Sequence, residues 1–195
     1  LVAAGGLNGP VLSSTGGGTS IQNIEIDASM SSQVNNISAI SLMGQNYLLA
    51  DLFVNDAYTG IQFVGSGHFQ AHDIVLTNIV NKGVITSGDN ADVSMDNVDV
   101  LSGGSSVVAA FDISTVQGVY TDIRSTIAVN DYAILLAGRH NVVKAFVSGT
   151  EATIYDIGEG NSYDIYNDVI KLSLNNMQVN VSGDLSVAAS HITEE

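Results

Sequence analysis

Short apolar runs alternate with polar turns along the chain, from Ile24 almost to the C-terminus. Most runs place apolar residues at every second position, which is the period of a strand with one buried face. The runs are too short for helices, and the chain is rich in Val, Ile, Asn, Asp, Ser and Gly, which favour strands and turns. The pattern therefore predicts an all-β fold.

The apolar runs group into a repeat of about 20–28 residues, and each unit contains two short strands. The first strands begin at Ile24, Leu52, Ile74, Val98, Ile123, Ala145 and Ile165, and the second strands begin at Ile40, Ile61, Val84, Phe111, Ile134, Ile154 and Ile170. Glycines mark the ends of most units, at Gly44, Gly65, Gly88, Gly138, Gly158 and Gly183. The long interval between Gly88 and Gly138 indicates that one unit lacks its glycine.

A unit of two short strands cannot bury its apolar face alone, so the repeat predicts units stacked in parallel around a common core. We expect a parallel β-helix, a solenoid of about seven rungs, over residues 21–185. We also expect an interior column formed by Ile61, Val84, Ile134 and Ile154. A β-sandwich is the alternative, but the hairpin signal Asn-Gly occurs once, at residues 8–9, outside the repeat.

Three segments place Asn or Asp directly before an apolar-x-apolar strand: residues 21–27, 71–78 and 94–100. In this pattern the chain resembles the right-handed parallel β-helix proteins of pectate-lyase-like architecture, and most of all the solenoid domains of phage tail spikes and fibres. The resemblance implies a right-handed coil. It also implies a role with polysaccharides, since the group includes polysaccharide lyases and hydrolases, virus tail spikes and surface adhesins.

The composition narrows the classes of partner. Lys and Arg together number 5 against 20 Asp and Glu, which gives a net charge of −15. Such a surface repels nucleic acid and anionic membranes. The chain has no cysteine, so disulfides and thiolate metal sites are excluded, and it has no apolar run long enough to span a membrane.

The two ends of the chain differ from the repeat. Residues 1–20 are rich in Gly and Ser and predict an extended arm or linker, either packed on a neighbouring subunit or joined to an upstream domain. Residues 186–195 predict a polar tail without a capping helix. The first residue is Leu, so we interpret the chain as a processed product or a piece of a longer protein.

Three Asn-Asp pairs follow a first strand: Asn55-Asp56, Asn130-Asp131 and Asn167-Asp168. They would supply carboxylates for glycoside cleavage if they converged on one groove. A recurring turn residue is the simpler interpretation, because Asn and Asp suit turns. The acidic stretch formed by Asp89, Asn90, Asp92 and Asp96 would offer oxygens to Ca²⁺, but it lacks the EF-hand spacing and we interpret it as a solvated turn.

The histidines are His68, His72, His140 and His191. His68 and His72 share one face of a predicted strand, which suits a metal or an acid/base pair, but a third ligand is not evident. Arg139 lies beside His140, yet the catalytic motifs of the β-helix enzymes have no match. The tyrosines would serve as sugar platforms or as packing between rungs; they are Tyr47, Tyr58, Tyr120, Tyr132, Tyr155, Tyr163 and Tyr166.

The sequence therefore predicts no catalytic, cofactor-binding or metal-ligating residues and no cofactor. We expect a structural and receptor-binding module of a virion surface protein, a phage tail spike or fibre, that contacts cell-surface polysaccharide. We expect a homo-oligomer, and in particular a trimer, at a virion surface or outside the cell. We expect other virion proteins as further partners. The alternatives are a polysaccharide lyase or glycoside hydrolase, and a bacterial surface adhesin.

Overall fold

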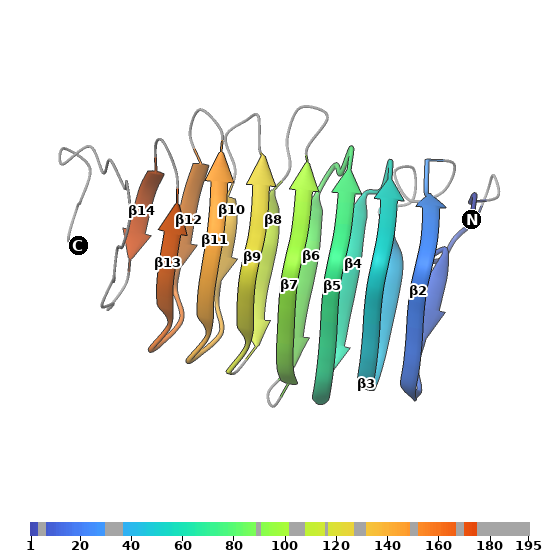
Figure 1. The fold of residues 1–195 in the computed structure, drawn as a ribbon, viewed down its shortest axis with the longest axis horizontal. Helices are drawn as coiled ribbons and strands as arrows, with labels where there is room; N and C mark the ends of the chain where they lie inside the picture. The colour runs from blue at the N-terminus through green and yellow to red at the C-terminus, as the bar shows by residue number, and fades with distance from the viewer. Residues whose placement is uncertain are drawn as a thin grey trace.

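The computed structural model describes residues 1–3, 7–29, 37–88, 91–101, 108–115, 117–126, 132–148, 152–166 and 170–174. Within these residues the chain forms strands and turns and no helix (Figure 1). The strands are β1 (Leu12–Ser14), β2 (Gly17–Asp27), β3 (Ser38–Asn55), β4 (Thr59–Gly65), β5 (Gly67–Thr77), β6 (Lys82–Gly88), β7 (Ala91–Leu101), β8 (Ala109–Thr115), β9 (Val119–Thr126), β10 (Tyr132–Leu136), β11 (Val142–Ser148), β12 (Ala152–Asp156), β13 (Ser162–Tyr166) and β14 (Ile170–Leu174). In this part of the chain no helix is long and apolar enough to cross a membrane.

The strands form two layers in which neighbouring strands are parallel (Figure 1). Sheet A contains β2, β5, β7, β9, β11 and β13, and sheet B contains β1, β4, β6, β8, β10, β12 and β14. The long strand β3 contributes its first part to sheet B and its second part to sheet A. The predicted parallel β-solenoid is confirmed, and the β-sandwich is not formed.

Over the residues that the structure describes, the coil makes about five turns, fewer than the seven rungs expected. The prediction assigned one rung to every pair of apolar runs.

The interior column of sheet B has the predicted residues. The pairing register joins Ile61 to Val84 and Ile134 to Ile154, and Phe111 connects the two halves of the column. All five side chains are buried. Sheet A has an equivalent column, formed by Leu52, Ile74, Val98, Ile123 and Ala145. The core is therefore continuous along the coil, because each turn buries its apolar residues against those of the next.

Glycines occupy one register at the bend where the chain leaves sheet B. A Cβ added to Gly65 would overlap the carbonyl oxygen of Gly44, and one added to Gly88 would overlap that of Gly65. Successive turns are thus too close at this bend for a side chain that points at the neighbouring turn. Thr115 pairs with Gly88 and lies against Gly138, so it occupies the glycine position of the unit between them. The long interval between Gly88 and Gly138 predicted such a unit without a glycine.

One residue in the middle of each of five sheet A strands has a left-handed backbone. These residues are Asn23, Asp51, Asp73, Asn97 and Asp122, with φ of 54°, 52°, 55°, 52° and 48°. Their chain neighbours pair in register, so the five form one row across the sheet. Asn and Asp tolerate this conformation better than other residues with side chains. The row explains why Asn or Asp recurs before the apolar-x-apolar strands.

The coil begins earlier than the predicted boundary at residue 21. Leu12 of β1 pairs with Ile40, and Thr19 of β2 pairs with Tyr47. The N–H of Ala3, which is buried, donates to the carbonyl of Asp27. Backbone pairing with β3 holds β1 and β2, and Val11 and Leu12 also pack against the core. This apolar pair is too short to stand out as a strand within a Gly- and Ser-rich segment. The predicted tail at 186–195 lies outside the described residues.

A buried polar network fills the bend in the later turns. The hydroxyl of Tyr120 lies 2.7 Å from Thr115 Oγ1 and 3.0 Å from Thr86 Oγ1. Asn141 accepts from Thr115 Oγ1 and from the N–H of Gly118, and its Nδ2 donates to the Thr115 carbonyl and to Asn161 Oδ1. Burial raises the pKa of Tyr120 to about 12, against the opposing effect of its hydrogen bonds. The network thus satisfies polar groups that are removed from water.

Candidate functional site

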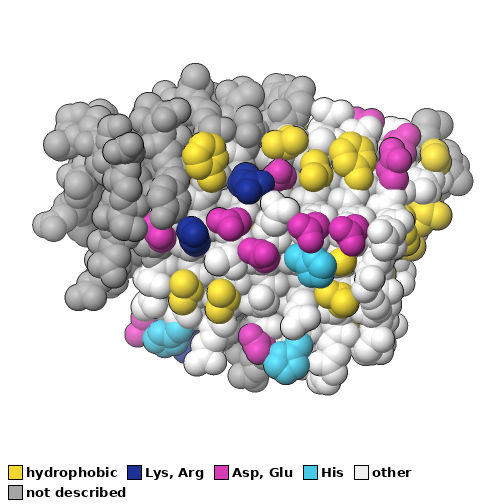
Figure 2. All heavy atoms as spheres, viewed as in Figure 1, with side chains coloured by type: hydrophobic (Ala, Val, Ile, Leu, Met, Phe, Trp, Pro, Cys, Tyr) yellow, Lys and Arg dark blue, Asp and Glu magenta, His cyan; other side chains and the backbone are white. Residues whose placement is uncertain are grey.

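The outer face of sheet A carries most of the described charges. Its carboxylates include Glu25, Asp51, Asp73, Asp92, Asp96, Asp99, Asp122 and Asp164. Figure 2 shows acidic side chains across this face, both in its middle and towards its edges, between scattered apolar side chains. Arg124 lies 3.2 Å from Asp99, and Lys144 lies 3.8 Å from Asp122, so both cations are paired with carboxylates. The face as a whole is acidic.

The histidines do not converge on one site. His68 Nδ1 lies 2.9 Å from a carboxylate oxygen of Asp92, and His72 Nδ1 lies 2.9 Å from one of Asp73. Both side chains point out of β5, as predicted, but each pairs with a different aspartate. The hydrogen bond from Asn97 and then that from His72 lower the pKa of Asp73 below its usual value. His140 lies at the bend against Gly160, and His191 is outside the described residues.

The first Asn-Asp pair forms a turn. Asn55 Nδ2 donates to Asp56, whose backbone is left-handed with φ of 56°. Asn55 Oδ1 accepts from Thr77 Oγ1 at 2.7 Å and from Asn78 Nδ2 at 3.0 Å, which ties the turn to the next one. These contacts agree with the turn interpretation. The pairs at 130–131 and 167–168 lie outside the described residues.

The acidic stretch at 89–96 is described only in part. Asp92 and Asp96 are exposed on β7, whereas residues 89 and 90 lie outside the described set. Across the described residues, no group of three or more His, Asp or Glu side chains is arranged to hold a metal ion.

Several tyrosines contribute to packing. Tyr47 and Tyr120 are buried. The rings of Tyr132 and Tyr155 stack between β10 and β12, with their centroids 5.1 Å apart. For this pair, the structure shows the packing between rungs that was one of the two predicted roles of the tyrosines. The side chains of Tyr163 and Tyr166 are outside the described set, so their role as sugar platforms stays a prediction.

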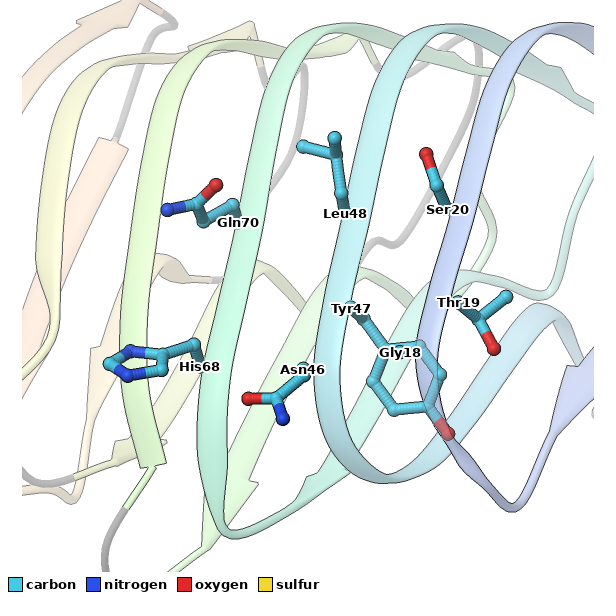
Figure 3. A pocket seen from close by; sticks show the side chains of 8 residues that line it. All are labelled: Gly18, Thr19, Ser20, Asn46, Tyr47, Leu48, His68 and Gln70. Carbon is cyan, nitrogen blue, oxygen red and sulfur yellow. The ribbon is translucent and has the colours of Figure 1, made fainter.

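A shallow hollow of about 370 Å³ lies on the outside of β2, β3 and β5. Its lining comprises Gly18, Thr19 and Ser20 of β2, Asn46, Tyr47 and Leu48 of β3, and His68 and Gln70 of β5 (Figure 3). Sequence reasoning missed this hollow. Its lining comes from three turns, and it opens where Gly18 has no side chain, so that a Cβ placed there would meet no atom within 4 Å.

The register of the strands arranges the lining in rows. Thr19, Tyr47 and Phe69 pair with one another and turn towards the interior, and the Tyr47 hydroxyl donates to the Met43 carbonyl at 2.8 Å. The residues on either side of that register face outward. One outward row contains Gly18, Asn46 and His68, and the other contains Ser20, Leu48 and Gln70. The hollow lies along these two rows.

The chemistry of the hollow is that of a binding surface. Asn46 and Gln70 supply amide donors and acceptors, Ser20 supplies a hydroxyl, and Leu48 supplies an apolar contact. His68, the one ionisable side chain among the outward residues of the lining, is paired with Asp92. The lining holds no pair of carboxylates for acid/base work. Comparisons with protein families, curated proteins and solved structures gave no match for the chain.

Proposed function

We propose that the chain is a structural and receptor-binding solenoid, displayed on a virion surface or outside the cell, that contacts cell-surface polysaccharide through the hollow on β2, β3 and β5. The observation that carries the proposal is the lining of the hollow: exposed amides and a hydroxyl beside an apolar side chain on a regular sheet. Sugars offer hydroxyls that both donate and accept hydrogen bonds, and amide side chains also do both. The placement on a virion rests on the resemblance to tail-spike solenoids.

A binding role fits the chemistry of the hollow better than catalysis does. Retaining and inverting glycosidases need two carboxyl groups about 5–10 Å apart across the substrate. The hollow contains amides where such a pair would be required. A lyase or hydrolase therefore remains the second candidate, and a bacterial adhesin the third.

The test is polysaccharide binding by the full chain and a variant that fills the hollow. Ser20→Trp places an indole in the outward row beside Leu48, and Ser114→Trp makes the same change at an exposed position of sheet B. We expect the wild type and Ser114→Trp to bind the same members of a glycan array, and Ser20→Trp to lose at least tenfold in affinity. Equal binding by Ser20→Trp, or no glycan bound by the wild type, would contradict the proposal.

Two further measurements separate the alternatives. Release of reducing ends or of unsaturated sugars from a bound polysaccharide would promote the enzyme. Sedimentation equilibrium of the full chain tests the homotrimer that the tail-spike resemblance implies, and a monomer at high concentration would remove that part of the proposal.

A further inference from the structure

We propose that the hollow selects uncharged glycans and disfavours acidic ones, such as those built from uronates or carrying phosphate or sulfate. This inference rests on the proposed function and adds the chemical class of its ligand. It follows from what lies in the hollow, what surrounds it and which groups are distant from it.

The outward side chains of the hollow offer an anion no fixed positive charge. Asn46, Ser20 and Gln70 are neutral, and Leu48 is apolar. His68 lies 2.9 Å from Asp92, so a proton on this ring is already matched by a carboxylate.

Carboxylates border the hollow on two sides. Asp51 and Asp73 follow Leu48 and Gln70 by three positions on the same strands, which at the rise of a strand is roughly 10 Å. Asp92 stands one strand beyond His68, roughly 4.8 Å away in the sheet. All three side chains are exposed on the face that carries the hollow. An acidic sugar in the hollow would therefore meet like charges at about one Debye length, which is roughly 8 Å at physiological ionic strength.

The cations of this face are distant and already paired. Arg124 is on β9 and Lys144 is on β11, two and three strands beyond β5 in sheet A. Arg124 donates to Asp99 and Asn97, and Lys144 lies near Asp122. Proteins that recognise carboxylates and phosphates use an Arg fork or a Lys at the ligand. The described hollow has neither.

The size of the effect follows from Coulomb's law. At about 10 Å in water, one carboxylate weakens the binding of one acidic group by roughly twofold. Asp51 and Asp73 together should therefore cost an acidic ligand about fourfold at low salt, and salt should reduce this difference.

The experiment measures the affinity of the full chain for matched neutral and acidic polysaccharides, dextran and carboxymethyl dextran, alongside cellohexaose and oligogalacturonate. We expect the neutral probe of a pair to bind more tightly at low salt, and the gap to narrow as salt is added. Tighter binding of the acidic probe, weakened by salt, overturns the inference and leaves the proposed function intact. Binding of no glycan at all refutes the proposed function, and the inference with it.

A pair of variants isolates the electrostatic cause. Asp51→Asn combined with Asp73→Asn removes both charges, and Asn suits the left-handed backbone there, as Asn23 and Asn97 show in the same row. We expect this variant to bind the acidic probe about fourfold more tightly at low salt and the neutral probe unchanged. Asp122→Asn, in the same row but two strands beyond β5, is the matched control and should change neither. An unchanged affinity of the double variant for the acidic probe contradicts the assignment.

Discussion

The buried hydroxyl of Tyr120 gives the sharpest test of the fold. Tyr120→Phe keeps the ring in the core and removes one oxygen that lies within hydrogen-bonding distance of Thr115 and Thr86. Thr115 retains its bond to Asn141, whereas Thr86 loses the partner that Tyr120 provides. A lost buried hydrogen bond with one group left unsatisfied costs about 1–3 kcal/mol. We expect the free energy of unfolding to fall by that amount at neutral pH.

The same residue predicts a pH dependence of known sign. The pKa of Tyr120 is raised from 10.0 to about 12 in the folded chain, so the unfolded chain loses this proton first as the pH rises. The stability that the neutral phenol contributes is complete below pH 10 and is lost as the pH approaches 12. The loss from this one group amounts to about 3 kcal/mol. Tyr120→Phe has no ionisable phenol at this position and does not undergo this loss. The difference in the free energy of unfolding between wild type and variant should therefore shrink over this pH range.

The assay is urea unfolding followed by circular dichroism, at neutral pH and at several values above pH 10. Tyr132→Phe is the matched control, because that ring is half-buried in a stack with Tyr155. It should cost less than about 1 kcal/mol. The reasoning is refuted if Tyr120→Phe is as stable as the wild type, or if the gap between them stays constant as the pH rises.

Three further changes test the coil and its outer face. Gly65→Ala should destabilise the chain by more than about 2 kcal/mol, because its Cβ would overlap a neighbouring carbonyl, whereas Gly9→Ala meets no atom within 4 Å and should be neutral in thermal melts. Ile134→Asp should cost over about 4 kcal/mol or prevent soluble expression, since it buries an unpaired charge, while Leu135→Asp, at a half-buried position, should cost less in the same solubility and melting assays. Asn97→Gly keeps the left-handed backbone but removes the main cause of the lowered pKa of the aspartate it bonds, so an NMR titration should show that pKa move back towards 3.8; no movement would contradict the assigned cause.

The interior of the coil could be predicted from the sequence because burial selects apolar residues at a fixed period. Ile61 and Ile134 lie in the interior column that the repeat predicted, and Thr115 stands at the glycine position of the unit that lacks a glycine. Thr115 is tolerated because its hydroxyl lies in the network of Tyr120 and Asn141. The sequence pattern shows that one unit lacks its glycine, but it does not show the hydrogen bonds that Thr115 makes in its place.

The hollow and the beginning of the coil could not be predicted, for two different reasons. The hollow depends on side chains such as Ser20, Asn46 and Gln70, which are far apart in the sequence and are brought together only by the register. The strand Leu12–Ser14 adds one side chain, Leu12, to the core, and backbone pairing with β3 holds the rest of it. The apolar run at Leu12 is too short to predict a strand, and the hydrophobic pattern carries no information about the hollow.

The passage of β3 through both sheets has a consequence for how the chain folds. β3 pairs with β1 and β2 on one side and with β4 and β5 on the other, so a single strand templates the turns before and after it. In a stacked fold each later turn then needs only its predecessor, and the loop closed at each step stays about one repeat long. The entropy cost of adding a turn is therefore nearly the same along the coil, so growth of the coil is a one-dimensional process that can extend in either direction from β3.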